Sequence, residues 1–368
     1  MQGDEHVFHM DAFEPGPGEP SPERAIEAGL RPTRLTEFVG QGRVVMDLRV
    51  HLEAAMQRGE APDHILFSGP PGLGKTSLAR ILAAELGTRL HATTGPALER
   101  PKDLVGLLTN LQVGDVLFLD EIHRVPVTVE EYLYTAMEDF RIEMTVDSGP
   151  HARVLPITIK PFTLVGATTR EGLLSRPFRE RFGLFERLDP YPASELAEII
   201  LRQARILGLD VTDDAAALLA ERARGTPRIA GRFLRRARDY AQVASATQLD
   251  LALAQETLQR LGVDALGLEE MDRRVLRCLA DQAGGPVALK TIGAVVGETD
   301  DTIEDVFEPH LLREGLILKT ARGRMLAPAG WRAIGRERPL PEEGSNAAAQ
   351  ATSPERQNER REQGGLFS

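Results

Sequence analysis

The chain has 368 residues, of which 42% are hydrophobic and 27% charged, and its formal net charge is -11. These proportions are typical of a water-soluble globular protein with room for two or three domains. The acidity excludes a protein whose whole surface is basic, although a local basic patch is still possible. A single cysteine, Cys278, excludes an internal disulfide and favours a reducing compartment. No apolar run reaches the roughly 20 residues that span a bilayer. We therefore expect a cytoplasmic protein with no membrane association.

The first half of the chain predicts an α/β domain. Residues 1–23 are acidic and rich in Pro and Gly, which predicts a disordered arm and not a signal peptide. Residues 24–190 alternate short apolar runs, at 64–68, 115–120 and 162–169, with helical patterns. Such alternation is typical of a parallel sheet covered by helices.

The second half predicts two smaller domains and a tail. Residues 191–262 carry apolar positions at helical spacing only, which predicts a small all-helical domain. Residues 263–338 contain three helical patterns followed by LILKT, a turn in ARGR, and MLA, which indicates a winged helix. Residues 339–368 are polar and of low complexity, so we expect a disordered tail.

A phosphate-binding loop is predicted at residues 69–76, where GPPGLGKT fits the pattern G-x-x-x-x-G-K-[ST]. A strand-like run precedes it and a helical pattern follows it, as this loop requires. Its glycines let backbone N–H groups surround the phosphates of ATP. Lys75 would reach the β and γ phosphates, and Thr76 would bind Mg²⁺.

Two carboxylates follow the apolar run 116–119, at Asp120 and Glu121. The carboxyl end of that strand should lie beside the phosphate loop. Asp120 would hold Mg²⁺, and Glu121 would polarise the attacking water, which points to hydrolysis. For His123, two residues on, a packing or relay role fits better than a catalytic one.

The next predicted strand ends in a polar residue, and a cluster of arginines follows it in the sequence. Thr169 follows the run 163–165 and could sense the γ-phosphate. Arg176, Arg179 and Arg181 come next. An arginine given to a transferring phosphoryl group contributes about 10³ to 10⁵ in rate, although such a cluster is also typical of surface charge.

This order of features, closed by GTPR at residues 225–228 at the start of a helix, is that of the AAA+ ATPases. Several motifs also match one family within this superfamily. LRPTRLTEFVGQ, GPPGLGKT, LDEIHR, AMEDF, SGPHAR, FTLVGATTR, GTPRIAGRFLRRARDYA and ARGR resemble the RuvB family, over about residues 24–336. The resemblance implies a large AAA+ ATPase domain (24–190), a lid (191–262) and a DNA-binding winged-helix head (263–338).

The resemblance also implies roles residue by residue. Thr169 matches the first sensor and Arg228 the second. Arg181 matches an arginine finger that acts on the neighbouring subunit, which implies a ring, hexameric by analogy. The residues implied at the nucleotide are Leu30, Arg31, Gly72, Gly74, Lys75, Thr76, Ser77, Glu138, Asp139, Phe140, Arg181, Tyr191 and Arg228.

By the same resemblance the chain is an ATP-driven motor that moves Holliday junctions in homologous recombination, DNA repair and the SOS response. Its implied partners are RuvA and, in the resolvasome, RuvC. Residues 141–159 alternate apolar and polar side chains about an SGP turn, which predicts a hairpin. The resemblance makes this hairpin a docking arm for RuvA. The alternative is an ordinary edge hairpin packed on the core.

We expect DNA contact through the wing, where Lys319, Arg322 and Arg324 would contact the backbone of the duplex. The third helix, which includes Asp300, is acidic and would be repelled by phosphate. Two positions depart from the family pattern: Asp300 stands where relatives often have an arginine, and Lys319 replaces a common arginine. Residues Gln363–Phe367 resemble a sliding-clamp binding peptide.

Three other functions share some of these motifs. A protein-unfolding AAA+ ring usually has an aromatic pore loop, and residues 87–114 contain no Phe, Tyr or Trp. A DExH-type helicase, suggested by DEIH, needs a second nucleotide-binding fold where this chain predicts helices and a wing. A clamp loader shares RPxxLxEFVGQ, but it would lack the hairpin and the winged head.

Overall fold

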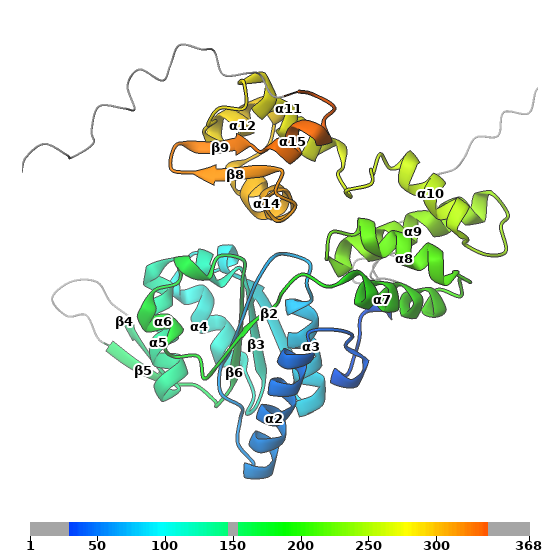
Figure 1. Cartoon of the computed structure of the whole chain (residues 1–368). Helices are drawn as coiled ribbons and strands as arrows, with labels where there is room; N and C mark the ends of the chain where they lie inside the picture. The colour runs from blue at the N-terminus through cyan, green and yellow to red at the C-terminus, as the bar shows by residue number, and fades with distance from the viewer. Residues whose placement is uncertain (1–28, 146–153, 338–368) are drawn as a thin grey trace, which may run out of the picture. The chain divides into compact units, whose positions relative to one another are not determined.

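The computed structural model describes residues 29–145 and 154–337 (Figure 1). These residues pack as two compact units. The first comprises the described residues up to Arg273 together with Asp300–His310, and the second comprises Arg274–Thr299 and the described residues from Leu311 onward. The predicted N-terminal arm, the tip of the hairpin, the C-terminal tail and the clamp-like peptide at 363–367 lie outside the described residues.

A five-stranded parallel sheet forms the centre of the first unit, with strand order β2-β3-β6-β1-β7. Its strands are β1 (Ile65–Ser68), β2 (Leu90–Thr94), β3 (Val116–Asp120), β6 (Thr163–Thr168) and β7 (Leu184–Arg187). Every residue of β1 and β6 is buried. Strands covered on both faces are apolar throughout, which explains the continuous runs in the sequence. The expected α/β fold is confirmed.

Helices cover both faces of this sheet. They are α2 (Gly42–Arg58), α3 (Lys75–Leu86), α4 (Pro101–Asn110), α5 (Val127–Asp139) and α6 (Arg176–Arg179), with short 3₁₀ turns η2 (Leu35–Glu37), η3 (Gly95–Ala97), η4 (Ile122–Arg124) and η5 (Glu171–Leu173). Successive strand residues point to opposite faces. Phe67 therefore packs in the core with α2 and α3, whereas Leu66 packs with α4 and α5.

A two-stranded hairpin stands outside the sheet. Strands β4 (Arg141–Thr145) and β5 (Val154–Thr158) pair antiparallel, and Ile142 lies opposite Ile157. Ile142 is fully buried, whereas Leu155 is exposed. The predicted hairpin therefore begins on the core and carries an exposed apolar side chain farther out.

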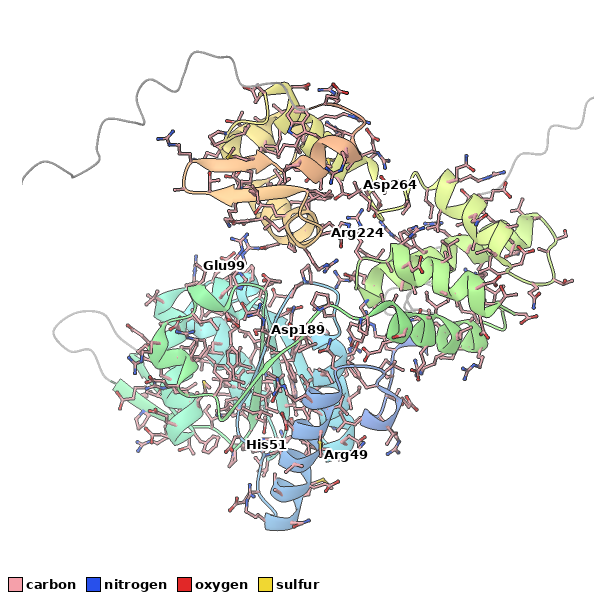
Figure 2. All side chains as sticks on the ribbon, in the orientation of Figure 1. Arg49, His51, Glu99, Asp189, Arg224 and Asp264 are labelled. Atoms are coloured by element: carbon pink, nitrogen blue, oxygen red, sulfur yellow. The ribbon has the colours of Figure 1, made fainter. Side chains whose placement is uncertain are left out.

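The lid is a bundle of four helices, α7 (Ala193–Ile206), α8 (Asp213–Arg222), α9 (Pro227–Val243) and α10 (Leu251–Arg260) (Figure 1). Thr212 and Asp250 cap α8 and α10 by accepting backbone N–H groups. Lid residues such as Phe233 belong to the same core as α2 and α3. Asp189, labelled in Figure 2, lies where the chain leaves β7 for the lid, and its carbonyl accepts the Gln41 amide at 2.6 Å.

The winged helix consists of short helices and a hairpin. The helices are α11 (Glu270–Asp281), α12 (Leu289–Val296), α13 (Asp300–Thr302), the π-helical stretch η6 (Ile303–Phe307), α14 (Glu308–Arg313) and α15 (Pro328–Ala333), and the hairpin is β8 (Ile317–Thr320) with β9 (Gly323–Leu326). The third helix predicted from the sequence is thus a run with a π-helical middle. Gly323 has φ of 137°, and a Cβ there would lie 2.2 Å from the carbonyl oxygen of Val287. No helix in the described ranges is long and apolar enough to cross a membrane.

Candidate functional site

The phosphate loop joins β1 to α3 and has room only for glycine at its bends. Gly69, Gly72 and Gly74 have φ of 129°, 81° and 110°, in the region that L-residues avoid. A Cβ on Gly69 would lie 2.4 Å from the carbonyl oxygen of Leu188. One on Gly74 would lie 3.0 Å from the Phe38 ring. The loop therefore presents backbone N–H groups at the N-terminus of α3, which is an arrangement suited to phosphate.

The side chain of Lys75 is fixed inside this loop by two hydrogen bonds. Its side chain is buried, and Nζ donates to the carbonyl oxygens of Gly69 at 2.7 Å and Pro70 at 2.9 Å. Burial lowers the pKa of Lys75 to about 8, while Asp120 and Glu121 oppose that change. These two carbonyl oxygens accept hydrogen bonds from the ammonium of Lys75. When a triphosphate is bound, its phosphate oxygens would accept them instead. A bound triphosphate would favour the charged form of the lysine and so raise its pKa again.

The carboxylate pair lies at the end of β3. Glu121 has φ of 50°, an unusual conformation for a side-chain-bearing residue and one that occurs often at active sites. Its N–H donates to Asp120 Oδ1 at 3.0 Å. Burial, and then the charge of Asp120, raises the pKa of Glu121. A carboxylate with a raised pKa is a better proton acceptor for water.

A polar network connects Glu121 to the tip of β6. Thr169 Oγ1 donates to Glu121 Oε2 at 3.4 Å. His123 Nδ1 lies 3.4 Å from the same oxygen and 2.9 Å from Oγ1 of the buried Thr168. Burial, and then Arg170, lowers the pKa of His123, which keeps the ring neutral near pH 7. The structure thus brings Thr169 to Glu121, and it gives His123 a place beside that carboxylate.

The lid touches the phosphate loop directly. The Arg228 N–H donates to the Gly72 carbonyl oxygen at 3.4 Å. A Cβ on Gly72 would lie 2.8 Å from Thr226 Cγ2. Tyr191 is buried and donates its hydroxyl to the Leu73 carbonyl oxygen at 3.2 Å. The two lid residues assigned to the nucleotide, Arg228 and Tyr191, therefore lie against the loop.

The N-terminal edge of the site depends on an arginine that the sequence did not single out. Leu30 is buried, and its carbonyl oxygen accepts from Arg202 Nη1 at 3.0 Å. Arg202 Nη2 also pairs with Glu37 at 3.4 Å. Arg202 lies on the lid helix α7, so the lid holds the segment of Leu30 and Arg31 in place. A lone arginine in an amphipathic helix is typical of a solvent-facing residue, so the sequence carried no signal for this contact. Ser77 and Thr76 are half-buried in the first turn of α3.

A second group of predicted residues gathers at α5 and α6. Arg181 Nε pairs with Glu138 at 3.2 Å, and its guanidinium lies 4.4 Å from the centre of the Tyr134 ring. Asp139 is exposed and Phe140 half-buried at the end of α5. In Figure 1, α5 and α6 lie away from the lid helices. The structure therefore brings Arg181 and Glu138 together, at a distance from the lid side of the phosphate loop.

The basic residues of the wing differ in exposure. Lys319 and Arg322 are exposed, at β8 and at the turn after it. Arg324 lies opposite Lys319 in the hairpin, but only 8% of it is exposed. Its N–H and carbonyl oxygen both pair with Val287 at 2.8 Å. Arg322 and Lys319 are thus better placed to meet DNA than Arg324 is.

Comparison with protein families finds three matches that follow one another along the chain. Residues 30–188 match the Holliday junction DNA helicase RuvB P-loop domain. Residues 191–264 match the RuvB AAA lid domain, and residues 265–335 match the RuvB C-terminal winged helix domain.

Individual relatives agree over most of the chain. The Holliday junction branch migration complex subunit RuvB of Myxococcus xanthus is 56% identical over 321 residues, which cover 87% of this chain and 94% of that protein. The subunit of the same name from Parafrankia sp. is 54% identical, over 86% of this chain and 90% of that protein. Among solved structures, the Thermotoga maritima RuvB Holliday junction branch migration motor superposes with a TM-score of 0.78 at 46% identity, and the match covers 84% of this chain and all of that one.

The pKa of Lys75 predicts how ATP binding depends on pH. The free lysine has a pKa of about 8, and a bound triphosphate raises that pKa, so binding takes up a proton. ATP affinity should be constant below pH 7 and should fall by up to about tenfold per pH unit above pH 8. Isothermal titration calorimetry in buffers of different ionisation enthalpy measures both effects. Lys75→Arg is the control, because arginine does not titrate in this range. A wild-type affinity that stays constant from pH 7 to 9.5 would contradict the assignment.

Proposed function

The chain belongs to the RuvB family, and we propose that it is the ATP-hydrolysing motor that moves Holliday junctions in recombination and DNA repair. The observation that carries this proposal is that Lys75 of the phosphate loop lies within electrostatic range of Asp120, Glu121 and the lid residue Arg228. Arg228 also contacts Gly72 of the loop, and the chain carries a winged helix as well. Membership of the family replaces the unfolding ring, the DExH helicase and the clamp loader as explanations of these motifs.

Nucleotide binding uses groups from both sides of the site. The N–H groups of the glycine-rich loop and the Lys75 ammonium receive the phosphates. Arg228 approaches from the lid through its contact with Gly72. Leu30 and Arg31, held by Arg202, form the edge assigned to the adenine nucleotide. The nucleotide thus bridges the sheet and the lid.

Hydrolysis depends on Glu121. Its raised pKa and its position at the sheet edge suit it to accept a proton from the attacking water. Thr169 orients the carboxylate through Oε2. Thr76 and Asp120 supply the hydroxyl and carboxylate oxygens that Mg²⁺ prefers, and the ion, when bound, neutralises charge on the phosphates. The described residues include no group of three or more His, Cys, Asp or Glu that could hold a metal. This suits an ion that takes its other ligands from phosphate and water.

Completion of the site requires a second subunit. Arg181 lies with Glu138 at α5 and α6 and is engaged there in its own chain. In a ring, this face of one subunit would meet the phosphate loop of the next and give it an arginine. Glu138, Asp139 and Phe140 would then border the site of the neighbour. We assign the working assembly as a hexameric ring.

The remaining assignments concern partners and location. Double-stranded DNA meets the wing through Lys319 and Arg322, and Arg324 supports the wing beside them. The hairpin 141–159 docks on RuvA, and RuvC joins the resolvasome. The location is the cytoplasm, and the activity belongs to the SOS response.

Removing the arginine finger tests the ring mechanism. Arg181→Ala should bind ATP normally and lose turnover by about 10³-fold, because the developing phosphoryl charge loses its partner. Mixing it with Lys75→Ala subunits should restore part of the turnover. Lys75→Ala subunits still carry the finger, and Arg181→Ala subunits still bind ATP. Steady-state ATPase assays across mixing ratios measure this complementation.

Arg179→Ala is the matched control, since Arg179 is exposed two residues away. Its turnover should remain within about twofold of wild type, as is usual for surface substitutions. Absence of complementation at every mixing ratio would contradict the assignment of Arg181 to the neighbouring site.

The wing assignment predicts a change in salt dependence. Arg322→Ala should weaken binding to duplex DNA at all sequences alike, and it should reduce the slope of log K against log salt by about 0.9. Fluorescence anisotropy from 50 to 300 mM salt measures that slope. The control is Arg58→Ala, which removes an exposed arginine of α2 that pairs with Glu60. If the Arg322→Ala slope equals that of wild type, the DNA contact lies elsewhere.

A further inference from the structure

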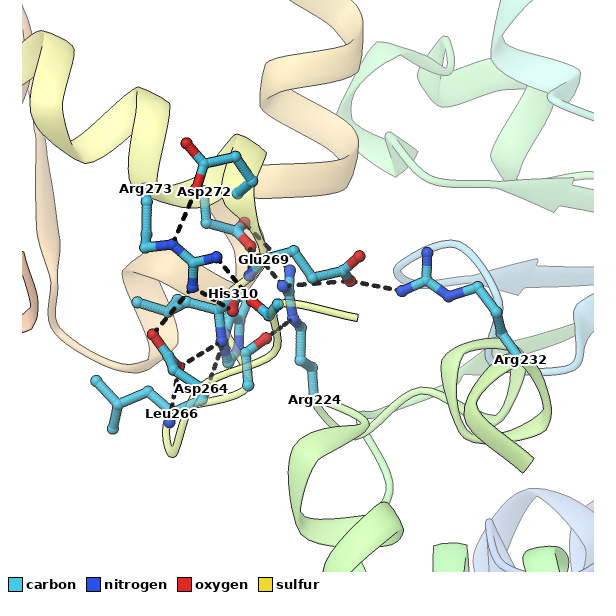
Figure 3. A network of polar contacts seen from close by, with 12 residues as sticks. Arg224, Arg232, Asp264, Leu266, Glu269, Asp272, Arg273 and His310 are labelled. Carbon is cyan, nitrogen blue, oxygen red and sulfur yellow. Dashed lines mark hydrogen bonds and ion pairs between the residues drawn. The ribbon is translucent and has the colours of Figure 1, made fainter. Parts of the chain in front are cut away.

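Arg224 is a buried arginine that joins the lid to the segment leading into the winged helix (Figure 3). It follows α8, has φ of 57°, and its side chain is only 6% exposed. Nε donates to the Gly267 carbonyl oxygen at 2.6 Å. Nη1 donates to Asp272 Oδ1 at 3.1 Å, and Nη2 pairs with Asp272 Oδ2 and, at 3.4 Å, with Glu269. This is a two-pronged arginine–carboxylate contact, the geometry that fixes orientation as well as distance.

Asp272 bonds both to the start of α11 and to Arg224 of the lid. It lies in the first turn of α11 and is fully buried. Its Oδ2 accepts the Glu269 N–H at 2.7 Å, which caps the start of that helix. Burial raises the pKa of Asp272, and the charge of Arg224 opposes that change. The same carboxylate therefore fixes the start of α11 and binds it to the lid.

The rest of this segment is bonded as well. Arg273 donates to the carbonyl oxygens of Gly262 at 2.7 Å and Leu268 at 2.9 Å. The His310 ring lies 3.1 Å from the carbonyl oxygen of Leu266. The chain between the lid and α11 is thus a braced connection, and its bonds are unlike those of a flexible linker.

The other end of the Arg224 segment reaches the nucleotide site. Residues 224–228 are consecutive, and the Gly225 carbonyl oxygen accepts the Tyr191 N–H at 2.9 Å. Three residues later, the Arg228 N–H meets the Gly72 carbonyl oxygen of the phosphate loop. One short segment therefore touches the phosphate loop, the entry to the lid and, through Arg224, the start of α11.

We propose that Arg224 is a positioning residue for translocation, which passes the state of the nucleotide site to the first turn of α11 through Asp272. The contact lies within the first unit, which includes Arg224 and the first turn of α11 with Asp272. Arg224 acts through Asp272 and not on ATP. The inference rests on the proposed motor function, and it assigns the residue that couples hydrolysis to movement.

A coupling role and a purely structural role predict different measurements. If Arg224 only stabilises the fold, its substitution lowers the melting temperature, ATPase and junction movement together. If it transmits motion, its substitution raises the number of ATP molecules consumed per junction moved, while the basal ATPase is retained. The ratio of hydrolysis to movement therefore separates the two roles.

The test uses Arg224→Lys in the full chain, with RuvA and a synthetic four-way junction. Lysine keeps the charge but lacks the planar fork that grips Asp272. ATPase without DNA, melting temperature and DNA affinity should stay close to wild type, with rates within about twofold, whereas ATP consumed per junction moved should rise about tenfold. Arg236→Lys is the matched control, because Arg236 is an exposed arginine of α9 that pairs with Asp239 of its own helix. It should leave the ratio unchanged.

Two further variants keep the test decisive if Arg224→Lys folds poorly. Glu269→Gln removes a partly exposed partner that Arg224 shares with Arg232, and it should raise the same ratio by about threefold. Asp272→Asn should reproduce the effect of Arg224→Lys. The double variant Arg224→Lys/Asp272→Asn should be no worse than either single variant, since both changes break one contact.

The outcomes separate this inference from the function on which it rests. If wild type hydrolyses ATP with RuvA and junction but moves no junction, the proposed function fails. If wild type moves junctions and both Arg224→Lys and Glu269→Gln move them at the wild-type cost in ATP, the inference is overturned while the function stands. A loss of movement that only follows the loss of basal ATPase and of melting temperature also overturns it.

Discussion

The structure depends on one close contact between backbones, where the lid meets the phosphate loop. The Arg228 N–H donates to the Gly72 carbonyl oxygen, and Thr226 leaves no space for a side chain on Gly72. Because these two segments touch, a shift of the loop acts directly on the start of α9. The lid is therefore sensitive to whatever fills the phosphate loop. Through this contact, cleavage of the γ-phosphate at the loop can shift the position of the lid.

The remaining parts of the site follow from that geometry. Each chain contributes the loop, Lys75, Glu121 and the lid residues to its own site, while Arg181 pairs with Glu138 elsewhere in the same chain. In the ring that we propose, binding would therefore occur within one subunit, whereas rapid hydrolysis would require the arginine of the next. A site divided in this proposed way would make each hydrolysis event depend on the state of a neighbour. The braced segment between the lid and α11 would transmit a change at the nucleotide site to the first turn of α11.

Sequence reasoning succeeded where the signal is local. The sheet, the glycine-rich loop and the carboxylates after β3 follow from short patterns, because strand burial and phosphate binding each constrain neighbouring residues. It missed Arg202 and the pair of Arg224 with Asp272, whose partners lie 172 and 48 residues away. The spacing of apolar and polar residues within a helix or strand carries no information about pairs so far apart in the sequence. The burial of Arg324 was also unforeseen, since a basic residue in a turn is usually exposed, and the π-helical stretch 303–307 has no signature in composition.

In this mechanism, the nucleotide moves the lid relative to the sheet. The most direct test of this movement is the distance between spin labels at Val113→Cys and Val243→Cys, both exposed positions, in a Cys278→Ala background. Pulsed electron paramagnetic resonance on the protein bound to RuvA and a junction should give distance distributions that differ between a non-hydrolysable ATP analogue and ADP, by several ångströms as in other domain closures. Identical distributions with the analogue, with ADP and without nucleotide, in protein that still moves junctions, would show that the nucleotide does not move the lid.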